Sequence, residues 1–269
     1  MSMDTVDDVL AGLDEVVERS IHEGDVCGYF AVVYRKVTAK IKEGLAAGFF
    51  DDPERMERLD VLFAARYLDA VAAHRVGGRP TDSWALTFDA GDRWRPLVLQ
   101  HLLVGINAHI NLDLGIAAAR CAPGSQLAGL RRDFDRVNAV LAAMITTLEA
   151  DLRAVSPWMG LLDHIGGRSR TELVRFSIVA ARAGAWQFAT ELAEEPTSRW
   201  SVPIEERDRR VAAVGRRVLR PGAWMSAGLL LVRLRERSDV AANLKLLRDG
   251  AEPSFEVIEA AIEGPTLKP

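Results

Sequence analysis

Residues 96–119 read PLVLQHLLVGINAHINLDLGIAAA, and this stretch decides the fold of the chain. Asp113 is its only formally charged side chain, and apolar residues lie on nearly all sides when the stretch is drawn as a helix. Such a helix is buried at the centre of a larger structure, whereas a surface helix keeps one polar face. Its interior polar side chains argue against a bilayer span. The sequence therefore predicts a buried central helix over about 95–120 and no membrane span.

Helical periodicity continues on both sides of this stretch. Apolar residues recur at spacings of three and four, and Thr5 and the pair Asp52 and Pro53 are typical helix starts. Further helices are expected over about 6–22, 29–47, 53–76, 125–155, 169–194, 204–219, 223–237 and 240–248. The expected fold class is all-α, a helical bundle of about eight to ten helices. We expect a single all-α domain over 1–269, with 197–269 as a C-terminal helical subregion docked on it.

The composition excludes several classes of protein. With 34 basic and 38 acidic residues and a net charge of -4, the chain lacks the basic surface that a nucleic-acid binder needs. Two cysteines, Cys27 and Cys121, are too few for a disulfide framework. The acidic, amphipathic N-terminus does not read as a signal peptide. We expect cytoplasmic localisation and a small-molecule substrate, and the composition is compatible with a homo-oligomer.

His109 and Asp113 form the most informative motif of the central helix. In an α-helix the two side chains share one face, about 40° and 6 Å apart. They could be ligands of a divalent metal such as Zn, Fe or Mn, a metal-free acid–base pair, or a structural pair. A buried carboxylate on an otherwise uncharged helix needs a partner, and we expect His109 to be that partner. Asn107 and Asn111 are also polar, which favours a functional site over a purely structural pair.

Other polar side chains are candidates to complete this site. A helical hairpin at Pro123 and Gly124 would bring Asp133 toward Asp113, so Asp133 is the expected third metal ligand. Its alternative role is that of an exposed carboxylate near a helix N-terminus. His101 is a further candidate catalytic residue on the His109 side of the helix, although the two histidines lie too far apart to share one ion.

Candidate substrate-binding residues lie on several helices. Arg175, Arg182 and Trp186 form a stripe on one helix that would suit an anionic substrate, although a salt-bridged structural face is the more frequent case. The candidate substrate-binding side chains are Asn107, Asn111, Arg182, Trp186 and Tyr67. Tyr34, Thr38, Asp60 and Arg66 are weaker candidates that read mostly as solvated positions.

Residues 77–91, GGRPTDSWALTFDAG, carry no helical period and are long for a connection. The Gly-Gly start and the apparently exposed Trp84 and Phe88 are typical of a mobile segment. We expect this segment to be a loop that controls access to the site.

Five strings of the chain together resemble the DUF5995 family of bacterial proteins. They are 30–38 (FAVVYRKVT), 49–53 (FFDDP), 59–67 (LDVLFAARY), 100–114 (QHLLVGINAHINLDL) and 176–186 (FSIVAARAGAW). The resemblance runs from about residue 29 to 248 and implies family membership, but no activity and no catalytic residue. The His109 and Asp113 pair is also faintly similar to the HxxxD ligand pair of the all-helical zinc-dependent phospholipase C and P1-type nucleases. The surrounding HYxGDxxQPxH string and the N-terminal tryptophan ligand of those enzymes have no counterpart here.

Three functions fit these patterns. The leading hypothesis is an enzyme that uses His109 and Asp113 for metal-assisted hydrolysis of an ester or phosphoester. The second is a metal-free lyase, isomerase or cyclase of secondary metabolism, and the third is a non-catalytic helical binding protein. The chain has no GxSxG, GxxxxGK[ST], GxGxxG or HExxH motif, which disfavours serine hydrolases, nucleotide-dependent enzymes and common zinc peptidases.

Overall fold

The structure, a computed structural model, describes residues 3–156, 170–256 and 258. Every regular element in these ranges is helical, and they contain no strand, so the all-α fold class is confirmed. The N-terminal elements are α1 (Val6–Glu23), α2 (Gly28–Ala46), α3 (Pro53–Arg75), α4 (Asp82–Asp89), α5 (Val98–Ala108), η1 (His109–Asp113) and α6 (Leu114–Cys121). The remaining elements are η2 (Gly124–Gln126), α7 (Leu127–Val155), α9 (Arg170–Ala193), η3 (Thr197–Arg199), α10 (Ser201–Leu219), α11 (Ala223–Arg233) and α12 (Val240–Asp249).

The helix ends follow the local chemistry of the sequence. The Thr5 side chain accepts a hydrogen bond from the Asp8 backbone N–H, and the Asp8 side chain bonds back to the Thr5 N–H, so α1 begins with a capping box. Gly24 ends α1 with a φ of 70°, in the left-handed region that glycine adopts readily. Asp52 caps α3 by accepting a hydrogen bond from the Arg55 N–H. These starts and stops were all expected from the sequence.

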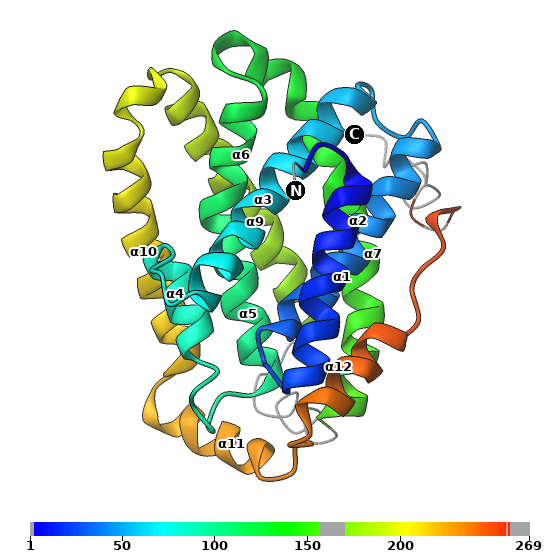
Figure 1. Ribbon diagram of the computed structural model, residues 1–269, viewed down its shortest axis with the longest axis vertical. Helices are drawn as coiled ribbons and strands as arrows, with labels where there is room; N and C mark the ends of the chain where they lie inside the picture. The colour runs from blue at the N-terminus through cyan, green and yellow to red at the C-terminus, as the bar shows by residue number, and fades with distance from the viewer. Residues whose placement is uncertain (1–2, 157–169, 257, 259–269) are drawn as a thin grey trace.

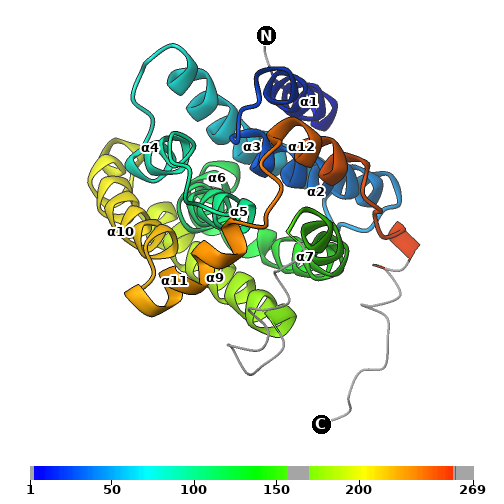
Figure 2. The ribbon, with the colours of Figure 1, turned by 90° about the horizontal axis from the view of Figure 1, so that it is seen from below.

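The central helix is buried as expected, but it is not α-helical throughout. Figure 2 shows α5 and α6 at the centre of the bundle, with α2, α3, α4, α7, α9 and α10 around them. The segment η1 between them is π-helical, and the Leu114 N–H bonds to the His109 carbonyl, one residue further back than in an α-helix. The expected central helix over about 95–120 is confirmed, and the π-helical turn at residues 109–113 is an addition that the sequence did not indicate. Such π-helical turns occur often at functional sites.

Residues Val98–Cys121 are long and apolar enough to cross a membrane, and within the described ranges they are the only helix of this kind. Most of this helix is buried by its neighbours. On one side Gly115 lets α9 approach closely, since a Cβ atom there would lie 2.8 Å from the Ala185 carbonyl oxygen. The apolar side chains of this helix are thus covered by the helices that pack around it.

The segment 77–91 is not the loop that we expected. Its middle forms α4, and Trp84 and Phe88 are both buried. The Asp208 carboxylate of α10 accepts hydrogen bonds from the Asp82 and Ser83 backbone N–H groups, which fixes the start of α4 against α10. The prediction of an exposed loop is wrong because Asp208, which is distant in the sequence, caps a short helix here. The local sequence indicates this helix only weakly.

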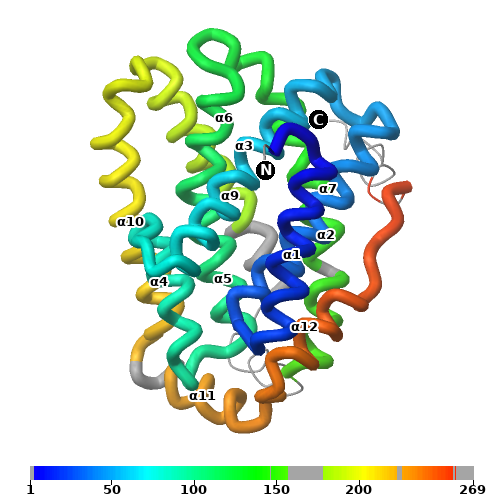
Figure 3. Tube along the Cα trace, viewed as in Figure 1, coloured from blue at the N-terminus to red at the C-terminus, as the bar shows by residue number. Residues whose placement is uncertain are grey.

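The C-terminal helices pack on both flanks of the bundle. α10 lies against α4 and α5, and α12 lies against α1, α2 and α7 (Figure 1). The Cα trace in Figure 3 shows α11 connecting these two flanks across one end of the molecule. This arrangement leaves α2, α3, α7 and α9 as the helices that surround the middle of the central helix on the side of His109.

Candidate functional site

A cavity, called the main cavity below, lies beside His109, between α2, α3, the central helix, α7 and α9. Its volume is about 120 Å³. Most of its lining is aliphatic or aromatic, including Val33, Val37, Leu59, Ile110, Leu141 and Met144. A largely preformed apolar cavity with a few polar groups is the usual form of a small-molecule site.

His109 presents an aromatic-stacked, neutral imidazole to this cavity. Its ring lies on the Phe63 ring, with centroids 3.5 Å apart and planes 11° apart, and meets the Tyr34 ring edge at 4.4 Å. Neither ring nitrogen has a hydrogen-bond partner among the described residues, and Nδ1 lies 3.7 Å from Asp113 Oδ2. Burial lowers the pKa of His109 below its usual value, with the Asp113 carboxylate acting in the opposite direction. The ring is therefore uncharged at neutral pH.

Asp113 is fully buried and is held by two donors that are closer than His109. Arg66 Nε of α3 donates a hydrogen bond of 2.6 Å to Oδ1, and Trp84 Nε1 of α4 donates one of 2.8 Å to Oδ2. The expectation that His109 is the main partner of Asp113 is wrong, because neighbouring helices supply a cation and an indole N–H. Arg66 is only a weak candidate by sequence and Trp84 falls in the segment expected to be a loop, so local sequence patterns carry little signal for either contact.

Tyr34 and Asp60 add two polar side chains to the wall of the cavity. Both side chains line the cavity, and the Tyr34 hydroxyl and Asp60 Oδ2 have no hydrogen-bond partner among the described residues. Burial, with a contribution from Glu57, raises the pKa of Asp60 to about 7. Burial and the nearby Asp60 also raise the pKa of Tyr34. By sequence both residues are weaker candidates, and the signal that they are internal is their place among apolar positions of α2 and α3.

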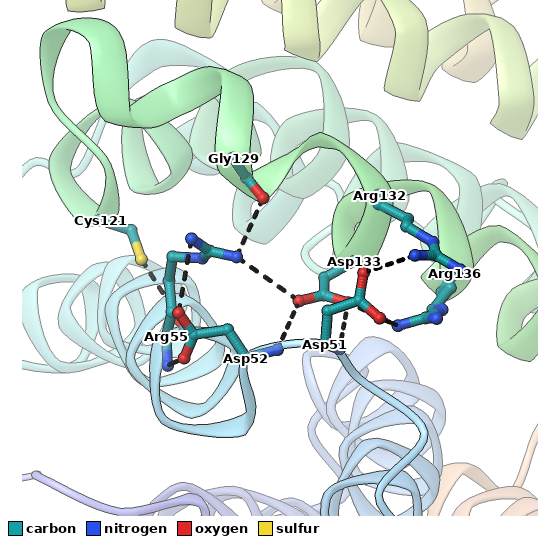
Figure 4. A network of polar contacts seen from close by, with 8 residues as sticks. All are labelled: Asp51, Asp52, Arg55, Cys121, Gly129, Arg132, Asp133 and Arg136. Atoms are coloured by element: carbon teal, nitrogen blue, oxygen red, sulfur yellow. Dashed lines mark hydrogen bonds and ion pairs between the residues drawn. The ribbon is translucent and has the colours of Figure 1, made fainter.

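Asp133 belongs to a different site. Its carboxylate accepts hydrogen bonds from the Asp51 and Asp52 backbone N–H groups at 2.7 and 3.1 Å and from Arg136 at 2.9 Å (Figure 4). Arg55 lies 3.7 Å from Oδ2, the oxygen that accepts the hydrogen bond from the Asp52 N–H. The expectation that Asp133 joins His109 and Asp113 is wrong, because α7 turns this side chain toward the chain that leads into α3. Asp133 thus fixes the start of α3.

The residues around His109 do not fit a metal ion. Within the described ranges, no group of three or more His, Cys, Asp or Glu side chains lies close enough together to hold one. A cation bound by Asp113 would also have to displace the Arg66 guanidinium or the Trp84 indole N–H. The pair therefore lacks the donor set that a metal-dependent step needs.

Three of the other predicted site residues, Asn107, Asn111 and His101, lie away from the main cavity. Asn107 donates a hydrogen bond to the Val211 carbonyl of α10, and Asn111 donates one to the Asn107 side chain. His101 lines a separate, water-sized cavity, and burial lowers its pKa to about 4. Neither the asparagines nor His101 line the main cavity. The Asn107 amide thus joins the central helix to α10, whereas the Asn111 amide bonds within the central helix.

The remaining predicted substrate-binding residues are Tyr67, Arg182 and Trp186, and they do not all line the main cavity. Tyr67 lines the small cavity beside His101, and Trp186 packs against Phe134. Arg182 does line the main cavity, together with His109 and Asp60. The side chain of Arg175 lies outside the described residues. Arg182 and Trp186 share one side of α9, since both pack against the Phe134 ring, but only Arg182 lines the main cavity.

The comparisons with known proteins bear on the family alone. A family model described as "Family of unknown function (DUF5995)" matches residues 6–221. The chain belongs to this family. The comparisons with curated proteins and with solved structures found no match.

The DUF5995 match includes nearly all of the candidate site. His109, Tyr34, Asp60 and Arg182 lie within the matched residues, as do the helices that carry them. Leu247 of α12 also lines the cavity, although it lies beyond the match. The cavity of this DUF5995 member is thus built on the matched helices and closed in part by a helix that follows them.

Proposed function

We propose that this protein binds a small, mostly apolar molecule inside its helical bundle. The observation that carries the proposal is the cavity of about 120 Å³, which combines an apolar lining with His109, Tyr34 and Asp60. Burial of a polar group without a partner is unfavourable by about 1–3 kcal/mol. A bound molecule with one hydrogen-bonding group would supply the missing partner while its apolar part fills the lining.

The volume limits the size of the molecule. An engineered apolar cavity of about 150 Å³ in another protein holds one benzene molecule. A cavity of about 120 Å³ therefore suits a buried portion of about six carbon atoms. Cyclopentanone and hexan-1-ol are suitable probes, since each has an apolar body and one polar group.

Filling the cavity tests this proposal. Val137 of α7 lines the cavity, so Val137→Phe places a larger side chain in the space that the ligand would occupy. We expect hexan-1-ol to raise the melting temperature of the wild-type protein and to bind measurably by calorimetry, because a ligand that binds only the folded state stabilises it. Both effects should be lost in Val137→Phe.

The matched control is Val179→Phe on α9, where the same volume is added at an exposed position. This variant should bind hexan-1-ol as the wild type does. Absence of binding to the wild type, or equal binding by Val137→Phe, contradicts the proposed function.

We propose as a second candidate that His109 acts as a general base toward the bound molecule. The observation in its favour is an imidazole that is neutral at neutral pH, has no partner at Nε2 among the described residues, and has the Asp113 carboxylate 3.7 Å from Nδ1. That carboxylate would stabilise the imidazolium formed when the ring accepts a proton. The substrate would be a molecule with an acidic C–H or O–H group.

Exchange of the α-protons of cyclopentanone in D₂O provides the measurement. A base removes an α-proton and D₂O returns a deuteron, and NMR follows the loss of signal. We expect the wild type to accelerate exchange at pH 7 and His109→Phe to give the buffer rate. The replacement keeps the stacking on Phe63 and removes two unpaired nitrogens, so its melting temperature at pH 7 should stay close to that of the wild type. Equal exchange rates for both proteins would refute the catalytic role.

A further inference from the structure

Arg182 is a buried cation that has no carboxylate partner among the described residues. Its side chain lines the main cavity and is 4 % exposed. The guanidinium lies over the Phe134 ring at 4.3 Å and donates a hydrogen bond to the Phe134 carbonyl, while Nε has no partner in the described part of the chain. A guanidinium has five N–H donors in a fork that matches a carboxylate. Arg182 therefore keeps unused donor capacity at a cavity wall.

The other cations near this cavity are neutralised. Lys36 lies 3.5 Å from the Asp151 carboxylate and donates a hydrogen bond of 2.9 Å to the Gly250 carbonyl. Arg66 is bound to Asp113. Asp135 contributes a favourable field at Arg182, but its carboxylate is engaged by Arg131 at 2.6 Å near the surface. Arg182 is thus the cation of this cavity wall that lacks a counter-ion.

An unpaired buried charge is strongly unfavourable, and a protein tolerates it where a bound partner completes the pair. Burial lowers the pKa of Arg182 to about 10, so the side chain remains protonated at neutral pH. A neutral ligand would leave this charge uncompensated. An anionic group on the ligand would accept hydrogen bonds from the free N–H donors.

We propose that the ligand of this cavity is a short-chain carboxylic acid whose carboxylate binds Arg182. This inference rests on the proposed function and adds the chemical class of the ligand. Asp60 lines the same cavity and would repel a carboxylate when it is ionised, so the carboxylate lies at the α9 side. The apolar chain of about six carbon atoms occupies the remaining, mostly aliphatic lining.

The experiment compares hexanoate with hexan-1-ol, which have the same carbon chain and differ in the head group. Calorimetric titrations use the full chain at pH 7 as wild type, Arg182→Met and Arg182→Lys. We expect Arg182→Met to weaken hexanoate binding by about tenfold or more and to change hexan-1-ol binding by less than about twofold, because a charge-assisted pair is lost for the acid only. Arg182→Lys should recover part of the affinity for hexanoate, since it keeps the charge and loses the fork.

Folding of the variants is checked by thermal melting, and Arg182→Met should remain folded because an apolar side chain replaces an uncompensated charge. Hexanoate binding that is unchanged in Arg182→Met overturns the carboxylate assignment, even if hexan-1-ol binding supports the cavity. Loss of hexanoate binding in Lys36→Met but not in Arg182→Met overturns it as well and assigns the anion to Lys36. Failure of both probes to bind the wild type overturns the proposed function together with this inference.

Discussion

Replacement of Asp113 by Asn is expected to destabilise the protein by about 3–5 kcal/mol, the loss typical of breaking a buried ion pair. Asp113 is fully buried, and its two oxygens accept hydrogen bonds from Arg66 and Trp84. An amide cannot accept at both positions, so one donor is left without a partner and Arg66 loses its counter-ion. In a chain of this size the melting temperature should fall by on the order of 10 °C.

Asp135→Asn is the matched control for this measurement. Asp135 is bonded to Arg131 at 2.6 Å, but both side chains are nearly half exposed. Surface pairs of this kind contribute about 0–1 kcal/mol, so the control should melt close to the wild type. If Asp113→Asn unfolds at the wild-type temperature, the contacts of Asp113 with α3 and α4 do not hold the central helix in place.

The second large effect concerns Asp60 and the dependence of stability on pH. The pKa of Asp60 is about 7 in the folded protein and about 3.8 in an ordinary, solvated aspartate. At pH values between these two pKa values, folding is accompanied by the uptake of a proton. The free energy of unfolding of the wild type therefore falls as the pH rises from about 4 to 7. Each unit of pKa difference corresponds to about 1.4 kcal/mol. The free energy of unfolding of Asp60→Asn, compared with that of the wild type at the same pH, should therefore rise by about 3 kcal/mol from pH 5 to pH 8.

Denaturant unfolding of both proteins at pH 5 and pH 8 measures this difference. The buried His101 and His109 titrate in both proteins, so their effects cancel in the comparison. Asp69→Asn is the control on the same helix, because Asp69 is exposed and its carboxylate is hydrated in both states. Parallel stability curves for the wild type and Asp60→Asn would show that the Asp60 carboxyl is not held in an apolar environment.

The two predictions separate the roles of neighbouring residues in the central region. Asp113 is satisfied by the protein itself, so its main role is to position η1 against α3 and α4. Four residues of the cavity wall each keep at least one polar atom without a partner among residues 3–156, 170–256 and 258: His109, Tyr34, Asp60 and Arg182. Thermal melting should therefore respond most strongly to Asp113, and ligand binding to the residues of the cavity wall.

The position of most helices could be predicted from local signals. Thr5 with Asp8, Gly24, and Asp52 with Pro53 act through hydrogen bonds and backbone angles within a few residues, so their effects are visible in the sequence itself. The burial of residues 98–121 follows from apolar side chains on all faces, which no surface helix carries. The same signals could not reveal α4, whose start is capped by Asp208, a residue 126 positions away from Asp82.

What the sequence by itself determined is the all-α class, most helix ends and the central position of the most apolar helix. Tertiary structure alone decided which polar residues meet: Asp113 bonds to Arg66 and Trp84, Asp133 turns to the start of α3, and Arg182 faces the cavity with His109. The physical reason is range, since caps and periodicity act within one or two helical turns. The partner of a buried charge depends instead on how helices from distant parts of the chain rotate and pack. The π-helical turn at residues 109–113 likewise lay outside the reach of the sequence, because an α-helix and a π-helix satisfy the same local pattern.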